Sequence, residues 1–413
     1  MICNILLSMW HNKWRTLLIL LLLTISFFLC FLALTNSFSF YMHISEVEKM
    51  FSVDTESVYI VNACEIEDFD NSGVDLTELK DFVNQQNGCI AGAYDVANVS
   101  FPELENNQEF IDLNKRAYTG THMSDFPYLV DTLYLDPEML QMVDFELSPD
   151  DIRSVEKDGK TYLPLYIGKD FENIVKKGDV LTDTRLGVEY LVSGVLPETK
   201  WFNDNDAIVQ PTISLNHMYV TSFSDADKAD PMSMQSTVGK IFLKCDENTA
   251  DQFIKKSLQK NMKLGTATVH DYIEEWKQAY GDILRQNISM TIIVAVCSII
   301  SIISALCVTV ILKKKEYGIR IAFGSSIKQI ILSYAFEMII LTIISGVIGF
   351  SLCYDSFANQ LIDPFRKVHL ETLCTSSLFY FIVILTFLLF IILFIPSIIL
   401  LKYHPADLIK EEE

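Results

Sequence analysis

The chain has many residue types that could carry chemistry, but few of them are spaced as a reactive site requires. The seven histidines are scattered, and the 53 acidic residues show no ligand-like spacing. Residues 68–73 (DFDNSG) begin like a calcium-binding loop, yet the later bidentate glutamate is missing. We therefore expect a solvated acidic surface there, and neither a metal site nor a catalytic residue.

Motifs for nucleotide binding and hydrolysis are also absent from the sequence. It contains no GxxxxGK[ST] phosphate loop, no HExxH, no CxxC and no GxSxG. The chain should therefore not bind ATP through a phosphate loop. We expect neither an enzyme nor a bound cofactor.

The nine cysteines do not read as a disulfide framework. Six of them lie in or beside long apolar runs, namely Cys3, Cys30, Cys297, Cys307, Cys353 and Cys374. Only Cys64, Cys89 and Cys245 lie in the polar part of the chain, which is an odd number. Three unpaired thiols are expected there, and a Cys64–Cys89 disulfide is the alternative.

A basic segment punctuated by glycines, residues 313–330 (KKKEYGIRIAFGSSIKQI), separates two long apolar runs. Helical spacing puts Ile319, Ala322 and Phe323 on one apolar face, and Lys315 and Arg320 elsewhere. The segment would thus present a small surface that is basic and partly apolar.

Stop and start signals follow this short helix. Gly324 suits the left-handed residue that ends a helix, and Ser326 with Gln329 matches the S-x-x-Q capping box that opens another. A tight turn at 324–326 is predicted, which would make the segment around it a corner between two helices. An ordinary positively charged loop is the other interpretation; it explains Lys313–Lys315 but does not require the apolar face or the stop and start signals.

Four apolar runs, at about 20 residues each, are long enough to cross a bilayer. Lysines and arginines lie before the first run, between the second and third, and after the fourth. The positive-inside rule then places both chain ends and the corner in the cytoplasm, and residues 41–286 outside. The first run is expected to be an uncleaved signal-anchor, because no small-residue cleavage site follows it.

Residues 41–286 differ sharply in composition from the rest of the chain. They hold 44 of the 53 acidic and 21 of the 32 basic residues, a net charge of −23, whereas the remainder nets +2. Strand-like and helix-like segments alternate at both ends of this region, and short strands with frequent turns fill about 125–235. We expect an α/β domain of βαβ type with an inserted β-rich subdomain.

Two helical segments, about 39–52 and 269–288, are expected to join this domain to the membrane. In the second, Tyr272, Trp276, Tyr280, Ile283 and Leu284 recur at spacings of three and four and form one apolar stripe. The two segments are predicted to pack against each other as a stalk.

Glu337 is an acidic residue inside the third apolar run. Nine residues beyond Lys328, it lies roughly 13 Å along a helix. An ionisable group at that depth is costly and usually faces protein or water. Either a functional or inter-helix role, or snorkelling of the side chain toward the cytoplasmic face, would account for it.

Several motifs together resemble those of MacB-like and FtsX-like ABC transporter permeases, the type VII family with four transmembrane helices. The signature of the corner is matched at Glu316, Gly318, Ile319, Arg320, Gly324, Gln329 and Ile330, with Glu337 after it. NKWRTLL (12–18), the GD…VSGV pattern within 175–197 and KYHPADLIK (402–410) are similar to family motifs in the same order. Ala322-Phe323-Gly324-Ser325 departs mildly from the usual Ala-Leu-Gly-Ala.

The resemblance implies a permease subunit in the plasma (inner) membrane of a bacterium, working by mechanotransmission. A separate ABC subunit would bind ATP and magnesium and dock at the corner through Lys315, Glu316, Gly318, Arg320, Phe323, Gly324, Ser325 and Lys328. The other implied partners are a second permease chain, in a homodimer or in a heterodimer with a related permease, a membrane-fusion or accessory protein, and the lipid bilayer. Nucleic acid is not expected.

Efflux of antimicrobial peptides or antibiotics is the leading function that the resemblance implies. The alternatives are an FtsX-like regulator of a cell-wall hydrolase and a lipoprotein-releasing permease. The expected organisation is a cytoplasmic segment 1–15, span 16–38, stalk 39–52, outer domain 53–268, stalk 269–288, span 289–312, connector 313–328, span 329–352, outer loop 353–375, span 376–401 and tail 402–413.

Overall fold

The computed structural model describes residues 13–66, 76–119, 122–202, 212–230, 236–260, 262–312, 314–359 and 366–402. The chain divides into two compact units. The first is drawn from Met1–Met42 and Ala279–Glu413, and the second is His43–Gln278. The acidic segment 68–73, residues 1–12 and the tail from residue 403 lie outside the described residues.

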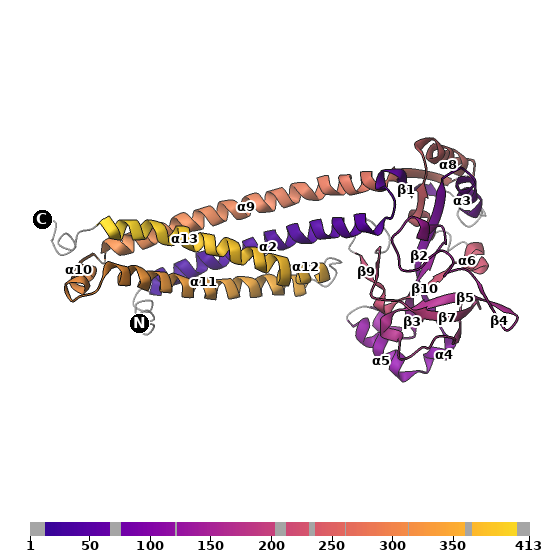
Figure 1. The fold of residues 1–413 in the computed structure, drawn as a ribbon, viewed down its shortest axis with the longest axis horizontal. Helices are drawn as coiled ribbons and strands as arrows, with labels where there is room; N and C mark the ends of the chain where they lie inside the picture. Colours follow the sequence, from indigo (N-terminus) through magenta and orange to yellow (C-terminus); the bar gives the residue numbers. More distant parts are fainter. Residues whose placement is uncertain are drawn as a thin grey trace. The chain divides into compact units, whose positions relative to one another are not determined.

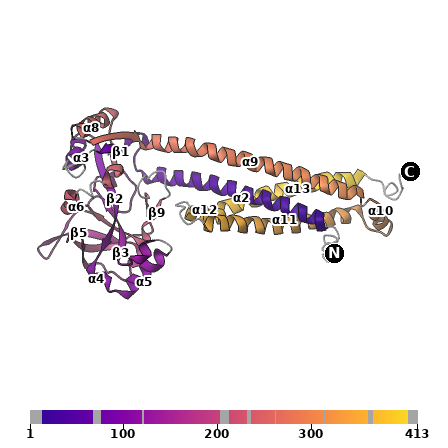
Figure 2. The same ribbon diagram turned by 180° about the vertical axis from the view of Figure 1, so that it is seen from behind.

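The first unit contains four helices that are long and apolar enough to cross a membrane. They are α2 (Lys13–Met50), α9 (Val269–Leu312), α11 (Ile327–Ala358) and α13 (Leu378–Lys402), with α10 (Lys314–Ala322), α12 (Arg366–Thr372) and a π-helical turn η7 (Leu373–Ser377) between them. Each predicted apolar run falls within one of these long helices, except that the first residues of the run 376–401 belong to η7. Figures 1 and 2 place α10 at the same end of this unit as the start of α2 and the end of α13, and α12 at the other end.

Aromatic rings and small hydroxyls hold the four helices together. Phe381 of α13 stacks on Phe31 of α2 at a centroid distance of 4.0 Å and meets Phe27 edge-on at 5.0 Å. The Ser26 hydroxyl donates to the Ser298 hydroxyl of α9 at 2.7 Å, so that two buried polar groups satisfy each other. The apolar core is thus shared by helices from both ends of the chain.

The second unit is built on a mixed sheet of ten strands among the described residues. Their order is β12-β1-β11-β2-β3-β10-β5-β7-β6, with β4 beside β5, and β8 pairs with β9 separately. The bounds are β1 (Val58–Ile66), β2 (Ile90–Ser100), β3 (Leu129–Leu135), β4 (Val155–Lys157), β5 (Lys160–Ile167), β6 (Val180–Thr182), β7 (Glu189–Val195), β8 (Lys200–Trp201), β9 (Ile213–Ser214), β10 (Tyr219–Ser222), β11 (Ile241–Lys244) and β12 (Met262–Thr268).

Two interlocked βαβ units form one end of this sheet, as expected from the alternating pattern. One is β1, α3 (Leu76–Asn84) and β2; the other is β11, α8 (Glu247–Gln259) and β12. β11 lies between β1 and β2 and is antiparallel to both. This is the split βαβ arrangement. Its core contains the apolar faces of α3 and α8, including Leu79, Val83 and Phe253.

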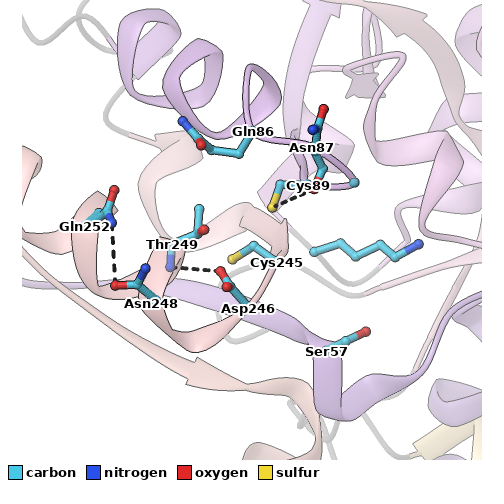
Figure 3. Close-up of a pocket in the computed structure, with 11 residues that line it drawn as sticks. Ser57, Gln86, Asn87, Cys89, Cys245, Asp246, Asn248, Thr249 and Gln252 are labelled. Carbon is cyan, nitrogen blue, oxygen red and sulfur yellow. Dashed lines mark hydrogen bonds between the residues drawn. The ribbon is translucent and has the colours of Figure 1, made fainter.

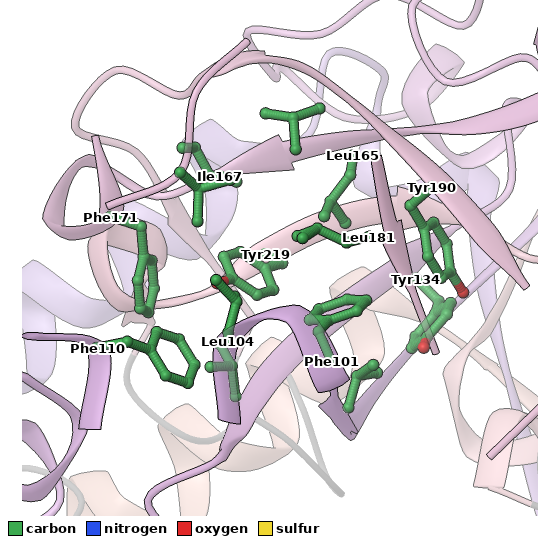
Figure 4. Packing of buried hydrophobic residues seen from close by; sticks show 14 of the residues in the cluster. Phe101, Leu104, Phe110, Tyr134, Leu165, Ile167, Phe171, Leu181, Tyr190 and Tyr219 are labelled. Carbon is green, nitrogen blue, oxygen red and sulfur yellow. The ribbon is translucent and has the colours of Figure 1, made fainter. Parts of the chain in front are cut away.

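The β-rich segment has its own core but not its own sheet. Beyond β2 the sheet continues with β3, β10, β5, β7 and β6, and β4 pairs with β5; α4 (Pro102–Glu105), α5 (Gln108–Ala117) and α6 (Asp225–Ala229) accompany these strands. Figure 4 shows the aromatic packing of this second core, with Phe101, Tyr190 and Tyr219 at its centre. The expected separate subdomain is therefore an extension of one sheet. β2 belongs to both cores, because Ala91 and Ala93 face the first and Val99 the second.

The strand order excludes the alternative Cys64–Cys89 disulfide. Ser57, before β1, accepts a hydrogen bond from the Cys245 amide, and Cys64 lies seven residues farther along β1. Two strand spacings also separate β1 from β2. The Cα atoms of Cys64 and Cys89 are therefore about 25 Å apart, whereas a disulfide needs at most about 7 Å.

Candidate functional site

The corner, residues 314–330, ends its first helix with a Schellman motif. The Gly324 amide donates to the Ile321 carbonyl at 2.9 Å, and the Ser325 amide donates to the Arg320 carbonyl at 3.0 Å. Gly324 has φ +95°, a conformation that disfavours residues with a Cβ atom. The predicted helix stop at Gly324 is thus confirmed, with the last carbonyls of α10 satisfied.

The second helix of the corner begins with the predicted capping box. The Ser326 hydroxyl accepts from the Gln329 amide at 3.3 Å, and the Gln329 side chain accepts from the Ser326 amide at 3.0 Å. Both bonds of the motif are present, which fixes where α11 starts. Only residues 323–326 separate α10 from α11, so the corner is tight.

The inner side of the corner is apolar and packed. Tyr317 and Ile330 are 4% exposed each and lie in one cluster with Ile321 and Ile331. Gly318 is also buried. This small core joins α10 to the first turn of α11, so the two helix ends should move together.

The outer side of the corner is apolar too, but it is exposed. Phe323 is 88% exposed and Ile319 48%, and Ala322 lies beside them on the same helix. The side chains of Arg320 and Lys328 are also exposed, and Ser325 is half-buried. The predicted apolar face is therefore present, and positive charge borders it.

Two predicted docking residues are placed only by their backbone. Lys315 and Glu316 belong to α10, and their side chains lie outside what the structure describes. The exposed surface of the corner is therefore described from Ile319 to Lys328.

Glu337 is buried and forms an ion pair with Arg15. Glu337 is 6% exposed, and the guanidinium of Arg15 on α2 contacts its carboxylate. The two residues tie α11 to the start of α2. This contact between α11 and α2 agrees with the inter-helix interpretation of Glu337. The sequence does not reveal this partner, because Arg15 lies before the first apolar run, where a basic residue already fits the positive-inside rule.

The stalk segments contact each other at two residues of the predicted stripe, Trp276 and Tyr280. Tyr280 stacks on Phe40 of α2 at 5.3 Å with ring planes 7° apart, and Trp276 meets His43 edge-on at 4.9 Å. The Tyr272 hydroxyl accepts from the Asn62 side chain. Tyr272, Trp276 and Tyr280 of the predicted stripe therefore all make contacts, although the partner of Tyr272 is on β1 and not on the other stalk segment.

Ile283 is a correction to that stripe. It is 52% exposed, whereas Leu284 and Ile273 are 5% and 3% exposed. An α-helix has 3.6 residues per turn. A step of three residues from Tyr280 therefore places Ile283 past the edge of the packed face of α9. Ile273 could have been found, since it lies seven residues before Tyr280.

No metal centre arises among the described residues, where no group of three histidine, cysteine or acidic side chains is close enough to hold an ion. No family model matches the chain, and no curated protein is significantly similar to it. The resemblance to ABC permeases therefore rests on the sequence motifs alone.

Proposed function

We propose that this chain is the permease subunit of an ABC transporter, and that a separate ATPase subunit docks on the corner. One observation carries the proposal: a tightly closed corner between two membrane-length helices exposes Phe323 and Ile319 beside Arg320 and Lys328. A phenylalanine side chain left almost wholly in water is a typical anchor for a partner protein.

The rigidity of the corner supports this use. The Schellman motif and the capping box fix the backbone on both sides of Gly324, and the cluster of Tyr317 and Ile330 joins the two helices. A surface that is already ordered loses little conformational entropy on binding. A plain loop would need none of these three features.

The four long helices suit a bilayer. Their outward side chains are mostly apolar, as at Ile292 and Ile293 of α9 and Phe387 and Phe390 of α13. With the basic corner in the cytoplasm, the acidic domain lies outside. α2 and α9 are unbroken helices that contribute residues to both units, so a displacement at their inner ends would be transmitted to that domain.

In this proposal the chain itself does no chemistry. ATP hydrolysis by the partner moves the corner, the helices carry the movement, and the outer domain acts on a substrate outside the membrane. Peptides or antibiotics are the substrate class that the sequence motifs favour.

The proposal is tested by co-expressing this chain with a candidate ABC ATPase subunit, purifying the complex and reconstituting it into lipid vesicles. Phe323→Ala removes the anchor and Arg320→Glu reverses a bordering charge. We expect each to lower vesicle ATPase activity by about 10-fold or more, because a central aromatic anchor is often worth 2 kcal/mol or more.

Phe379→Ala is the matched control, since Phe379 is an exposed aromatic (64%) at the start of α13, away from the corner. Its ATPase activity should equal that of the unsubstituted complex. Equal activity in all three variants, or the absence of any copurifying ATPase, would contradict the proposal.

A further inference from the structure

Strand register brings two thiols opposite each other in the second unit. Cys89 immediately precedes β2, and Cys245 immediately follows β11. These strands are antiparallel, and Lys244 is opposite Ile90. Continuing the register by one residue pairs Cys245 with Cys89.

The backbone hydrogen bonds identify the type of this pair. The Cys245 amide donates to the Ser57 carbonyl at 3.2 Å, and the Cys89 amide donates to the Gln86 carbonyl at 3.2 Å. Neither amide is used across the pair, which is therefore a non-hydrogen-bonded pair with Cα atoms about 4.5 Å apart. Disulfides span Cα distances of about 4.4–6.8 Å.

Both side chains point to the same face of the sheet. Cys245 is in the first core, and Cys89 packs against that core as a half-buried residue. Directly opposed residues share a face, so no strand has to move to bring the two sulfur atoms into bonding distance. Rotation of the side chains is enough.

A pocket of about 540 Å³ gives access to the pair. Figure 3 shows Cys89 and Cys245 among the polar side chains that line it, such as Asn87, Asn248 and Gln252. A glutathione-sized reagent could therefore approach the thiols. Burial, and then the neighbouring Cys89, raise the pKa of Cys245 to about 12. The more accessible Cys89 is thus the thiol that reacts first.

We propose that Cys89 and Cys245 form a reversible intramolecular disulfide by exchange with a small disulfide of the glutathione class. The Cys89 thiolate attacks one sulfur of the oxidised reagent, and one reagent thiolate leaves. The Cys245 thiol then loses its proton and attacks the Cys89 sulfur, which expels the second reagent thiolate. Two protein thiols are oxidised, one reagent disulfide is reduced, and the two thiol protons end on the two reagent thiols.

This bond would tie the start of β2 to the end of β11, and so close a loop that contains the entire β-rich segment. Closing a long loop restricts the unfolded chain more than the folded one. The inference does not depend on the proposed transport function, because it concerns the second unit alone.

The test uses the full chain in detergent, incubated with oxidised glutathione, alkylated and digested without reduction. Peptide mapping should find Cys89 joined to Cys245 in most molecules, and none after treatment with dithiothreitol. The midpoint of thermal unfolding should rise on oxidation by roughly 5–15 °C. The rise should vanish in Cys89→Ser and persist in Cys297→Ser, where an exposed thiol of α9 is replaced.

Recovery of Cys89 as a stable mixed disulfide with glutathione, with Cys245 still available for alkylation after denaturation, would overturn the proposal. So would a peptide that joins Cys89 to Cys64. Peptide mapping of the unsubstituted chain shows whether Cys89 and Cys245 form the disulfide even if a variant fails to fold.

Discussion

Arg15 and Glu337 form a largely buried ion pair within the first unit. Their side chains are 14% and 7% exposed. Withdrawing two charges from water costs several kcal/mol each, and their mutual attraction offsets that cost only while both are present. The pair therefore contributes more to holding α2 and α11 in one register than to net stability.

A double-mutant cycle tests this reasoning. Arg15→Met leaves a buried carboxylate without its counter-charge and should lower the free energy of unfolding by about 3 kcal/mol. Arg15→Met combined with Glu337→Leu should recover most of that loss. Thermal or denaturant unfolding in detergent measures both.

An exposed pair supplies the control for this cycle. Arg285 and Asp282 are 84% and 81% exposed, and Arg285→Met should change the free energy of unfolding by no more than about 0.5 kcal/mol. A double variant as unstable as Arg15→Met alone would show that packing, and not charge pairing, dominates the site.

The pairing of Arg15 with Glu337 was out of reach of sequence reasoning for a simple reason. The two residues are 322 positions apart, so no local pattern links them. The depth of Glu337 in its apolar run did indicate that a partner or water must be present. That Glu337 needs a partner or water was therefore predictable, but that the partner is Arg15 was not.

Among the elements, the corner was the most predictable part of the chain. Gly324, Ser326 and Gln329 act through hydrogen bonds to residues no more than five positions away. Local sequence determines such motifs. The pairing of β2 with β11 and β3 was not predictable, because it depends on segments far away in the chain.

Substitution of Gly324 separates backbone strain from crowding at the corner. A Cβ at this position meets no heavy atom within 4 Å, so only the positive φ opposes a side chain. Gly324→Val should lower the free energy of unfolding by about 1–2 kcal/mol and reduce ATPase activity in the reconstituted complex. Gly324→Asn should have a much smaller effect, because asparagine tolerates this conformation.

Unfolding midpoints and vesicle ATPase rates measure both effects. Equal losses in the valine and asparagine variants would mean that the left-handed turn is not what holds the corner.

Over the whole molecule, charge and hydropathy divide the chain in the same way as the structure does. The predicted polar region 41–286 and the second compact unit, His43–Gln278, nearly coincide. That agreement arises because composition alone distinguishes a water-facing domain from membrane-length helices. The side of the membrane on which the domain lies is an expectation from the positive-inside rule.

Labelling of introduced cysteines tests that orientation. Lys255 on α8 and Lys328 at the corner are both exposed, so Lys255→Cys and Lys328→Cys should preserve the fold. A membrane-impermeant maleimide applied to intact cells should label Lys255→Cys strongly above the unsubstituted chain. Lys328→Cys should be labelled only after lysis. The reverse pattern would place the acidic domain in the cytoplasm and end the transporter proposal.

The position of β11 between β1 and β2 imposes an order of events on a nascent chain. All the strands of the second core lie within residues 90–222, whereas the first core lacks its central strand until residue 244 has left the ribosome. The β-rich part can thus mature during translation, while β1 waits for both of its strand partners, β11 and β12. Arrested chains of increasing length would reveal this delay as late-acquired protease resistance at residues 58–66.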